Sequence, residues 1–187
     1  MKDLILYIKS FFIDKHIRFI YKNNFKNRIK LFFARLFWKN PYKNTKACSI
    51  YKTEKSYKII TVYPVSSGLL TEKEPVYILP LSIKAEELKD AIFDAVSASK
   101  LISYKEYKNT AIDYLKMLKE KSLKNLYTNS KHCSVYLKNN TVDVHFSKYS
   151  EKYKCLEYDE EPNLIIEYSE ENKLKIVNEI IEIMNHK

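Results

Sequence analysis

Two histidines and an aspartate lie close together in the stretch KHCSVYLKNNTVDVHF. If this stretch forms a β-hairpin, His132 and His145 occupy diagonal positions on one face, about 7 to 8 Å apart. Asp143 lies two residues from His145 on the same side. The imidazoles could act as acid and base in phosphodiester cleavage, with Lys131 or Lys138 stabilising charge. Histidines on a solvent-facing strand are more often ordinary surface residues, so a nucleic-acid-processing or nucleic-acid-binding role is kept as an alternative.

The segment 131–146 has the pattern of one complete hairpin. Two runs rich in β-branched and aromatic residues flank Asn139 and Asn140, which tolerate the positive φ angles of a two-residue type I′ turn. With these residues at the centre of the turn, the expected strand pairs are Lys138 with Thr141, Tyr136 with Asp143, Ser134 with His145, and His132 with Ser147.

This register sorts the side chains of the hairpin onto two faces. The face expected to enter the core carries Cys133, Val135, Leu137, Val142, Val144 and Phe146. The face expected to meet water or a partner carries His132, Ser134, Tyr136, Lys138, Asp143 and His145. Because Cys133 and His132 point to opposite faces, they cannot bind one metal ion.

The sequence has no recognisable catalytic or cofactor motif. A single glycine in 187 residues excludes glycine-rich phosphate loops, and neither CxxC nor HExxH occurs. Three cysteines suit a reducing compartment, and no apolar stretch reaches the roughly 18 residues of a membrane-spanning helix. We therefore expect a cytoplasmic protein that is not an enzyme and has no cofactor, metal or small-molecule substrate.

Charge is distributed unevenly along the chain. Residues 1–46 carry twelve basic and two acidic side chains, whereas residues 151–187 carry five lysines and ten acids. Segments 3–21 and 25–38 have the pattern of amphipathic helices with aromatic and cationic sides, so residues 1–46 are interpreted as a helical extension. Binding of this extension to an anionic membrane surface is a second alternative, less favoured than packing within the protein.

The remaining residues, 47–187, predict a single α+β domain in which helices pack on a largely antiparallel sheet. Strands are expected over 49–53, 57–63, 75–79 and 164–168, with a loop at Gly68 and another over 149–162. Ser82, Ser103 and Ser169 are the expected N-caps of three helices. In the first of these helices Leu88, Ala91, Ile92, Ala95, Val96 and Ser99 form the inner face, and in the last one Leu174, Val177, Ile181 and Met184 do so.

Two stretches resemble the CdiI family, the immunity proteins of bacterial contact-dependent growth inhibition systems. In EELKDAIFDAVSASK (residues 86–100) the matching positions are Leu88, Ala91, Ala95, Val96 and Ser99, while Lys89 and Lys100 replace a usual glycine and arginine. In the hairpin the matching positions are Lys131, Cys133, Leu137, Asn139 and Asn140, and Ser134 replaces a usual aromatic residue. The resemblance spans residues 57–187 and includes the last helix.

The resemblance implies a protein that binds and neutralises the CdiA C-terminal toxin domain, usually a nuclease acting on RNA or DNA. An inhibitor of a nuclease should offer acidic groups to the basic cleft of the enzyme. The predicted toxin-binding residues are therefore Glu157, Tyr158, Asp159, Glu160 and Glu161, although an ordinary solvated loop would have the same composition. No direct contact with nucleic acid is expected.

Overall fold

The computed structural model describes residues 40–109, 114–158 and 161–186. Residues from Pro41 to Lys187 belong to one compact unit. The helices expected over 3–21 and 25–38 lie outside the described residues, so the division of the chain at residue 46 stays a prediction.

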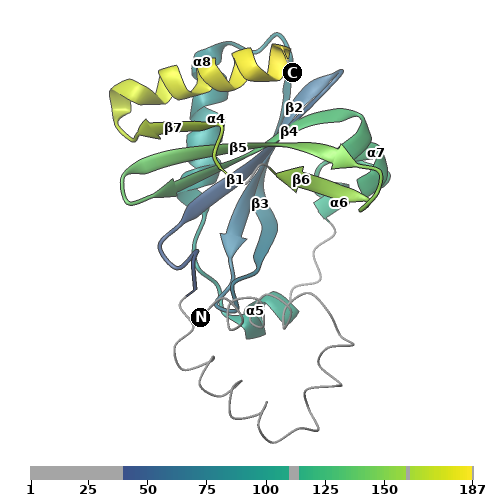
Figure 1. Ribbon diagram of the computed structural model, residues 1–187, viewed down its shortest axis with the longest axis vertical. Coiled ribbons are helices and arrows are strands. Elements are labelled where there is room, and N and C mark those ends of the chain that lie inside the picture. The colour runs from purple at the N-terminus through teal and green to yellow at the C-terminus, as the bar shows by residue number, and fades with distance from the viewer. Residues whose placement is uncertain (1–39, 110–113, 159–160, 187) are drawn as a thin grey trace, which may run out of the picture. The chain divides into compact units, whose positions relative to one another are not determined.

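The order of elements is mixed, as expected for an α+β protein (Figure 1). The strands are β1 (Lys46–Thr53), β2 (Ser56–Pro64), β3 (Leu70–Pro80), β4 (Ser130–Lys138), β5 (Thr141–Ser150), β6 (Cys155–Tyr158) and β7 (Leu164–Glu167). The helices are α4 (Ala85–Ala98), α5 (Tyr104–Asn109), α6 (Tyr114–Met117), α7 (Leu123–Thr128) and α8 (Glu170–His186).

The described strands form one seven-stranded sheet in the order β3-β2-β1-β4-β5-β6, with β7 paired to β5 beside β6. Every pairing between these strands is antiparallel. The α+β prediction and the largely antiparallel sheet are therefore confirmed. Among the described residues, no helix is long and apolar enough to span a membrane.

The central hairpin has the predicted register. Lys138 pairs with Thr141, and the other three predicted pairs are also present. Asn139 and Asn140 have φ angles of 49° and 63°, as a type I′ turn requires. The turn residues and the strand alternation predict the same pairing, so the sequence was sufficient to determine the register of the hairpin.

Helices α4 and α8 cover the first face of the sheet and form the main core with it (Figure 1). The hairpin contributes Cys133, Val135, Val142, Val144 and Phe146 to this core, and Leu137 packs at its margin. The expected inner face of α4 is buried. In α8 the buried residues are Ile176, Val177, Ile180 and Met184. Of the other two predicted inner residues, Ile181 is half-buried and packs against the main core, and Leu174 is only half-buried, so the predicted face is correct in part.

Three local predictions need correction. Helix α4 starts after Lys84, which makes no side-chain cap, so Ser82 is not its N-cap. The segment 149–162 is not all loop, because β5 continues to Ser150 and β6 pairs with it. Helix α7, capped by the Ser122 hydroxyl, was not predicted. The other two expected caps are present, because Ser103 accepts from Glu106 N–H at 3.0 Å and Ser169 accepts from Asn172 N–H at 3.2 Å.

The second face of the sheet is covered in part, contrary to the sequence-based expectation. A smaller core forms there from Tyr51, Ile60, Leu118 and Leu126, with Met117 of α6 and Tyr127 of α7 packed against it. On the same face His132 packs between Tyr51 and Tyr158, and His132 and Ser134 are only 1% and 3% exposed. The prediction that this face meets water or a partner was therefore wrong for His132 and Ser134.

Candidate functional site

His132 is buried between aromatic rings and does not line an open catalytic face. Its ring centroid lies 4.5 Å from that of Tyr51 and 5.9 Å from that of Tyr158. Nδ1 hydrogen-bonds Ser147 Oγ at 2.6 Å, and Nε2 has no partner among the described residues. Burial lowers the pKa of His132 to about 3. A neutral, enclosed imidazole of this kind cannot exchange protons with a bulky phosphodiester at neutral pH.

The other members of the predicted catalytic group are not brought together around His132. His145 is half-buried with its ring 5.6 Å from Tyr136, and burial lowers its pKa while Asp143 opposes that shift. Lys131 donates to Asn185 O at the end of α8, on the first face of the sheet. The arrangement gives no acid and base pair that shares one accessible face.

Cysteine chemistry and metal binding find no support in the described part of the chain. Cys48 and Cys133 are buried in the main core, where burial raises the pKa of both thiols. Cys155 is exposed, and all three cysteines are free. No group of three or more histidine, cysteine, aspartate or glutamate side chains is placed to hold a metal ion in the described residues.

The predicted acidic segment lies where the edge of the sheet is interrupted. Strands β6 and β7 both pair with β5, and the chain leaves β5 between Tyr158 and Leu164. Asn163 binds the chain to β5 just before β7 begins, because its N–H donates to Val144 O at 2.9 Å and its Oδ1 accepts from Phe146 N–H at 2.7 Å. The acidic segment 157–161, which we call the acidic bulge, therefore belongs to the connection between two strands that pair with the same neighbour.

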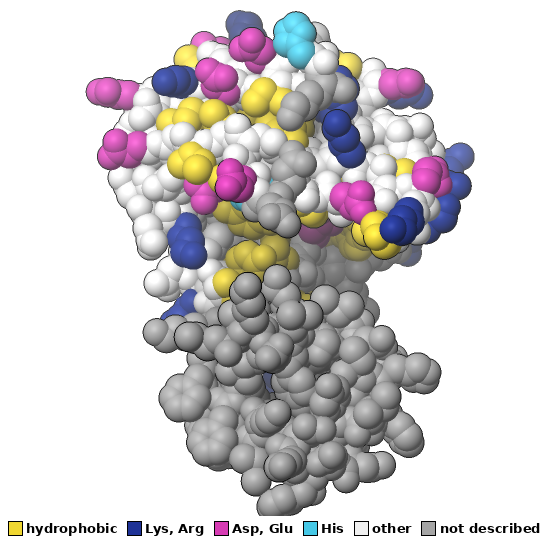
Figure 2. All heavy atoms as spheres, in the orientation of Figure 1, with side chains coloured by type: hydrophobic (Ala, Val, Ile, Leu, Met, Phe, Trp, Pro, Cys, Tyr) yellow, Lys and Arg dark blue, Asp and Glu magenta, His cyan; other side chains and the backbone are white. Residues whose placement is uncertain are grey.

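The acidic side chains of this bulge differ in their surroundings. Glu157, Tyr158 and Glu161 are exposed, and Asp159 and Glu160 lie outside the described residues. Glu157 is directly opposite Lys148 on β5, which offsets its charge. Figure 2 shows acidic and basic side chains interspersed over the face in view.

A second grouping, which we call the tyrosine cluster, was not predicted from the sequence. It consists of Tyr51, Tyr114, Tyr127 and Tyr158 around the carboxylate of Glu72. Tyr51 donates to Glu72 Oε1 at 2.9 Å, and its ring stacks on Tyr127 with centroids 6.4 Å apart. Burial raises the pKa of all four tyrosines, and the Glu72 charge adds to each shift, so the four hydroxyls lie within reach of its field.

The tyrosine cluster draws on five elements of the fold. Glu72 comes from β3, Tyr51 from β1 and Tyr158 from β6, while Tyr114 and Tyr127 come from α6 and α7. Burial raises the pKa of the Glu72 carboxyl, and hydrogen bonds from Tyr51 and Ser49 partly oppose that shift. No sequence pattern joins these segments, since abundant tyrosine, 16 in all, hides the few that converge.

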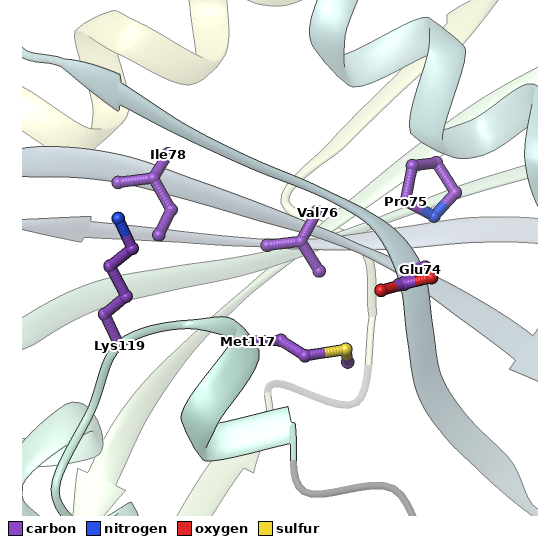
Figure 3. A pocket seen from close by; sticks show the side chains of 6 residues that line it. All are labelled: Glu74, Pro75, Val76, Ile78, Met117 and Lys119. Carbon is purple, nitrogen blue, oxygen red and sulfur yellow. The ribbon is translucent and has the colours of Figure 1, made fainter.

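A shallow groove of about 750 Å³ lies beside the tyrosine cluster, between β3 and α6 (Figure 3). Its lining residues are Glu74, Pro75, Val76, Ile78, Met117 and Lys119. Figure 3 shows the Lys119 and Glu74 side chains toward opposite ends of a mainly apolar floor. The lining includes no imidazole, thiol or hydroxyl, so the groove suits contact with apolar groups better than chemistry.

Comparison with known proteins adds a family to this geometry. A family model described as "CdiI: CDI immunity protein" matches residues 46–175, which run from β1 into α8. No curated protein matches the chain. A solved Neisseria meningitidis structure, "Protein of Unknown Function NMB0488", superposes with a TM-score of 0.56 at 16% identity, covering 76% of this chain and 94% of that one, so the fold is shared.

Another solved structure, the "CdiA-CT/CdiI toxin and immunity complex from Yersinia pseudotuberculosis", superposes with a TM-score of 0.44 at 12% identity. That alignment covers 60% of this chain and 78% of the other.

Proposed function

The chain belongs to the CdiI family of immunity proteins from contact-dependent growth inhibition systems, and we propose that it acts by one-to-one binding without chemistry of its own. The family match over residues 46–175 carries this conclusion, because it includes the whole described sheet. The protein neutralises its cognate toxin, and its partner is the C-terminal toxin domain of CdiA.

We propose that the toxin is a nuclease acting on RNA or DNA. Residues 151–187 carry ten acidic side chains and five lysines. Exposed acids among them, including Glu157, Glu161 and Glu167, would complement the basic cleft that a nuclease needs to hold phosphates. Because nucleic acid is the target of such a toxin, we place the protein in the cytoplasm, where its free cysteines would stay reduced.

The acidic bulge is the proposed toxin-binding surface, with Glu157, Tyr158 and Glu161 as its described members. Tyr158 is 48% exposed and would supply a rigid aromatic contact between two carboxylates. Membrane binding through residues 1–46 stays an alternative, and deleting residues 1–40 followed by vesicle flotation would test it.

The first experiment is a titration against the toxin domain encoded next to this gene, with growth rescue as a second measurement. We expect tight one-to-one binding and full rescue of cells that produce the toxin. A non-cognate CdiA toxin domain is the matched control and should not bind. Absence of binding to the cognate domain would overturn the immunity role.

A second experiment tests whether the protein has nuclease activity. Purified protein is expected to leave RNA and DNA intact, because His132 is enclosed and does not share an accessible face with His145. Cleavage that disappears in His132→Ala or His145→Ala would contradict the proposal and support the enzymatic alternative.

A further inference from the structure

Glu72 lies in the middle of the tyrosine cluster, and the described residues include no cationic partner for it. Within the described part of the chain, its hydrogen-bond partners are the hydroxyls of Tyr51 and Ser49, and no lysine or arginine forms an ion pair with it. By contrast, the buried ammonium of Lys58 on the same face of the sheet is paired with Glu120. Partial burial already raises the pKa of the Glu72 carboxyl, so a counter-charge brought by a partner would stabilise the carboxylate there.

The surroundings of Glu72 have the chemistry of a receptor for a cation. Aromatic ring faces attract cations, and a carboxylate held by hydroxyl donors is already oriented for one. Tyr51 and Tyr127 stack nearly parallel, with an interplanar angle of 13°, and the Tyr51 hydroxyl donates to the carboxylate.

The tyrosine cluster is also open to a partner. Glu72 is only half-buried, and Tyr158 is 48% exposed at the sheet edge, whereas Tyr51 at the base is 2% exposed. Tyr158 and Glu72 are therefore the members of the cluster, compared with Tyr51, that a side chain arriving from solvent can contact.

We propose that the tyrosine cluster receives one cationic side chain, an arginine, from the bound toxin domain, with Glu72 as its charge partner. This inference rests on the proposed immunity function and on the basic cleft expected of a nuclease. Arginine fits better than lysine, because its planar guanidinium stacks on tyrosine rings and donates two parallel hydrogen bonds to a carboxylate.

The test compares the full-length protein with Glu72→Gln in calorimetric titrations against the cognate toxin domain. Gln keeps the shape and the acceptor oxygen but removes the charge, so the expected result is a rise in Kd of at least about 30-fold. Thermal unfolding should show no loss of stability, since a neutral amide is easier to bury than a carboxylate. Glu182→Gln, an exposed acid on α8 across the sheet, is the matched control and should bind like the wild type.

Two further measurements separate recognition from folding. Tyr158→Leu alters a half-exposed side chain, keeps apolar bulk and removes the ring, and should raise Kd at least about 10-fold in a folded protein. Replacing toxin arginines one at a time by alanine should reveal one that couples with Glu72→Gln in a double-mutant cycle.

Unchanged affinity of the folded Glu72→Gln protein, or additive effects with every toxin arginine, would overturn the proposal while leaving the immunity function intact. Failure of the wild-type protein to bind the toxin would overturn both.

Discussion

His132 shows how the same side chain changes its chemistry when a second layer covers it. On an open strand it would titrate near neutral pH, but between Tyr51 and Tyr158 burial lowers its pKa to about 3. Its Nδ1 keeps one hydrogen bond, to Ser147. The residue therefore contributes packing and a dependence of stability on pH.

The free energy of unfolding should fall as the pH drops from about 6.5 towards 3. Over this range the unfolded chain binds a proton at His132 and the folded protein does not, so acid favours unfolding. The loss should approach about 1.4 kcal/mol per pH unit below 6.5. Urea unfolding of the wild type and of His132→Phe at several pH values would measure it.

The His132→Phe protein should show a flatter pH dependence than the wild type. His186→Gln, a change at an exposed position near the end of α8, is the control and should follow the wild-type curve. A His132→Phe curve parallel to the wild type would show that other groups carry the acid sensitivity.

At the scale of the elements, one buried ion pair fastens the connection after α6 to the second face of the sheet. Lys58 on β2 pairs with Glu120 and donates to Leu118 O at 2.7 Å. Leu118 itself is fully buried in the smaller core. Lys58 thus forms both an ion pair and a hydrogen bond to a backbone carbonyl in the segment that covers this face.

Glu120→Ala should destabilise the protein by about 3 kcal/mol, because it leaves the Lys58 ammonium buried without a counter-charge. Chemical denaturation would measure the change. Glu151→Ala breaks a pair whose two side chains are more than half exposed, and it should leave stability nearly unchanged because water screens the pair. Equal effects of the two substitutions would mean that water solvates Lys58 in the folded protein.

The turn of the central hairpin offers an opposite case, in which a substitution should stabilise. Asn140 has a φ of 63°, which glycine adopts without the steric cost that other residues pay. Asn140→Gly should therefore raise the free energy of unfolding by about 0.5 to 1 kcal/mol, as determined by urea denaturation.

The backbone hydrogen bond from Tyr168 N–H to Asn140 O does not depend on the side chain and should survive in Asn140→Gly. Asn140→Val, which places a β-branched residue at positive φ, should destabilise and serves as the comparison. A higher free energy of unfolding for Asn140→Val would show that the turn had changed type.

At the scale of the whole molecule, the distribution of charge bears on how fast the toxin is captured. Reversing Glu157 and Glu161 to lysine should slow association by about tenfold or more at low salt, because long-range attraction to a basic cleft would be lost. Dissociation should change less, since exposed charges act mainly before contact.

Stopped-flow association measured at several salt concentrations would test this, with Glu86→Lys plus Glu87→Lys on α4 as a control that makes the same charge change. Identical slowing in the two double variants would indicate that only net charge matters. No slowing in either would move the interface away from the acidic bulge.

The central hairpin shows what local sequence determines about this protein. Only one register is compatible with the turn residues at 139 and 140 and with the strict alternation on either side of them. The observed pairs are those that this register predicts. The Ser103 and Ser169 caps and the inner face of α4 were likewise predictable, since each depends on residues within a few positions of one another. The same local patterns were enough to indicate an α+β fold.

The tertiary structure alone decided which layer covers each face of the sheet. Alternation separates two faces but does not say what packs on them, so polar Ser134 and His132 looked solvent-facing although both are buried, His132 between Tyr51 and Tyr158. The tyrosine cluster depends on this long-range choice, because Tyr51, Glu72 and Tyr158 meet only when β1, β3 and β6 take their places in one sheet. Such contacts are set by the burial of surfaces far apart in sequence, and no short pattern records them.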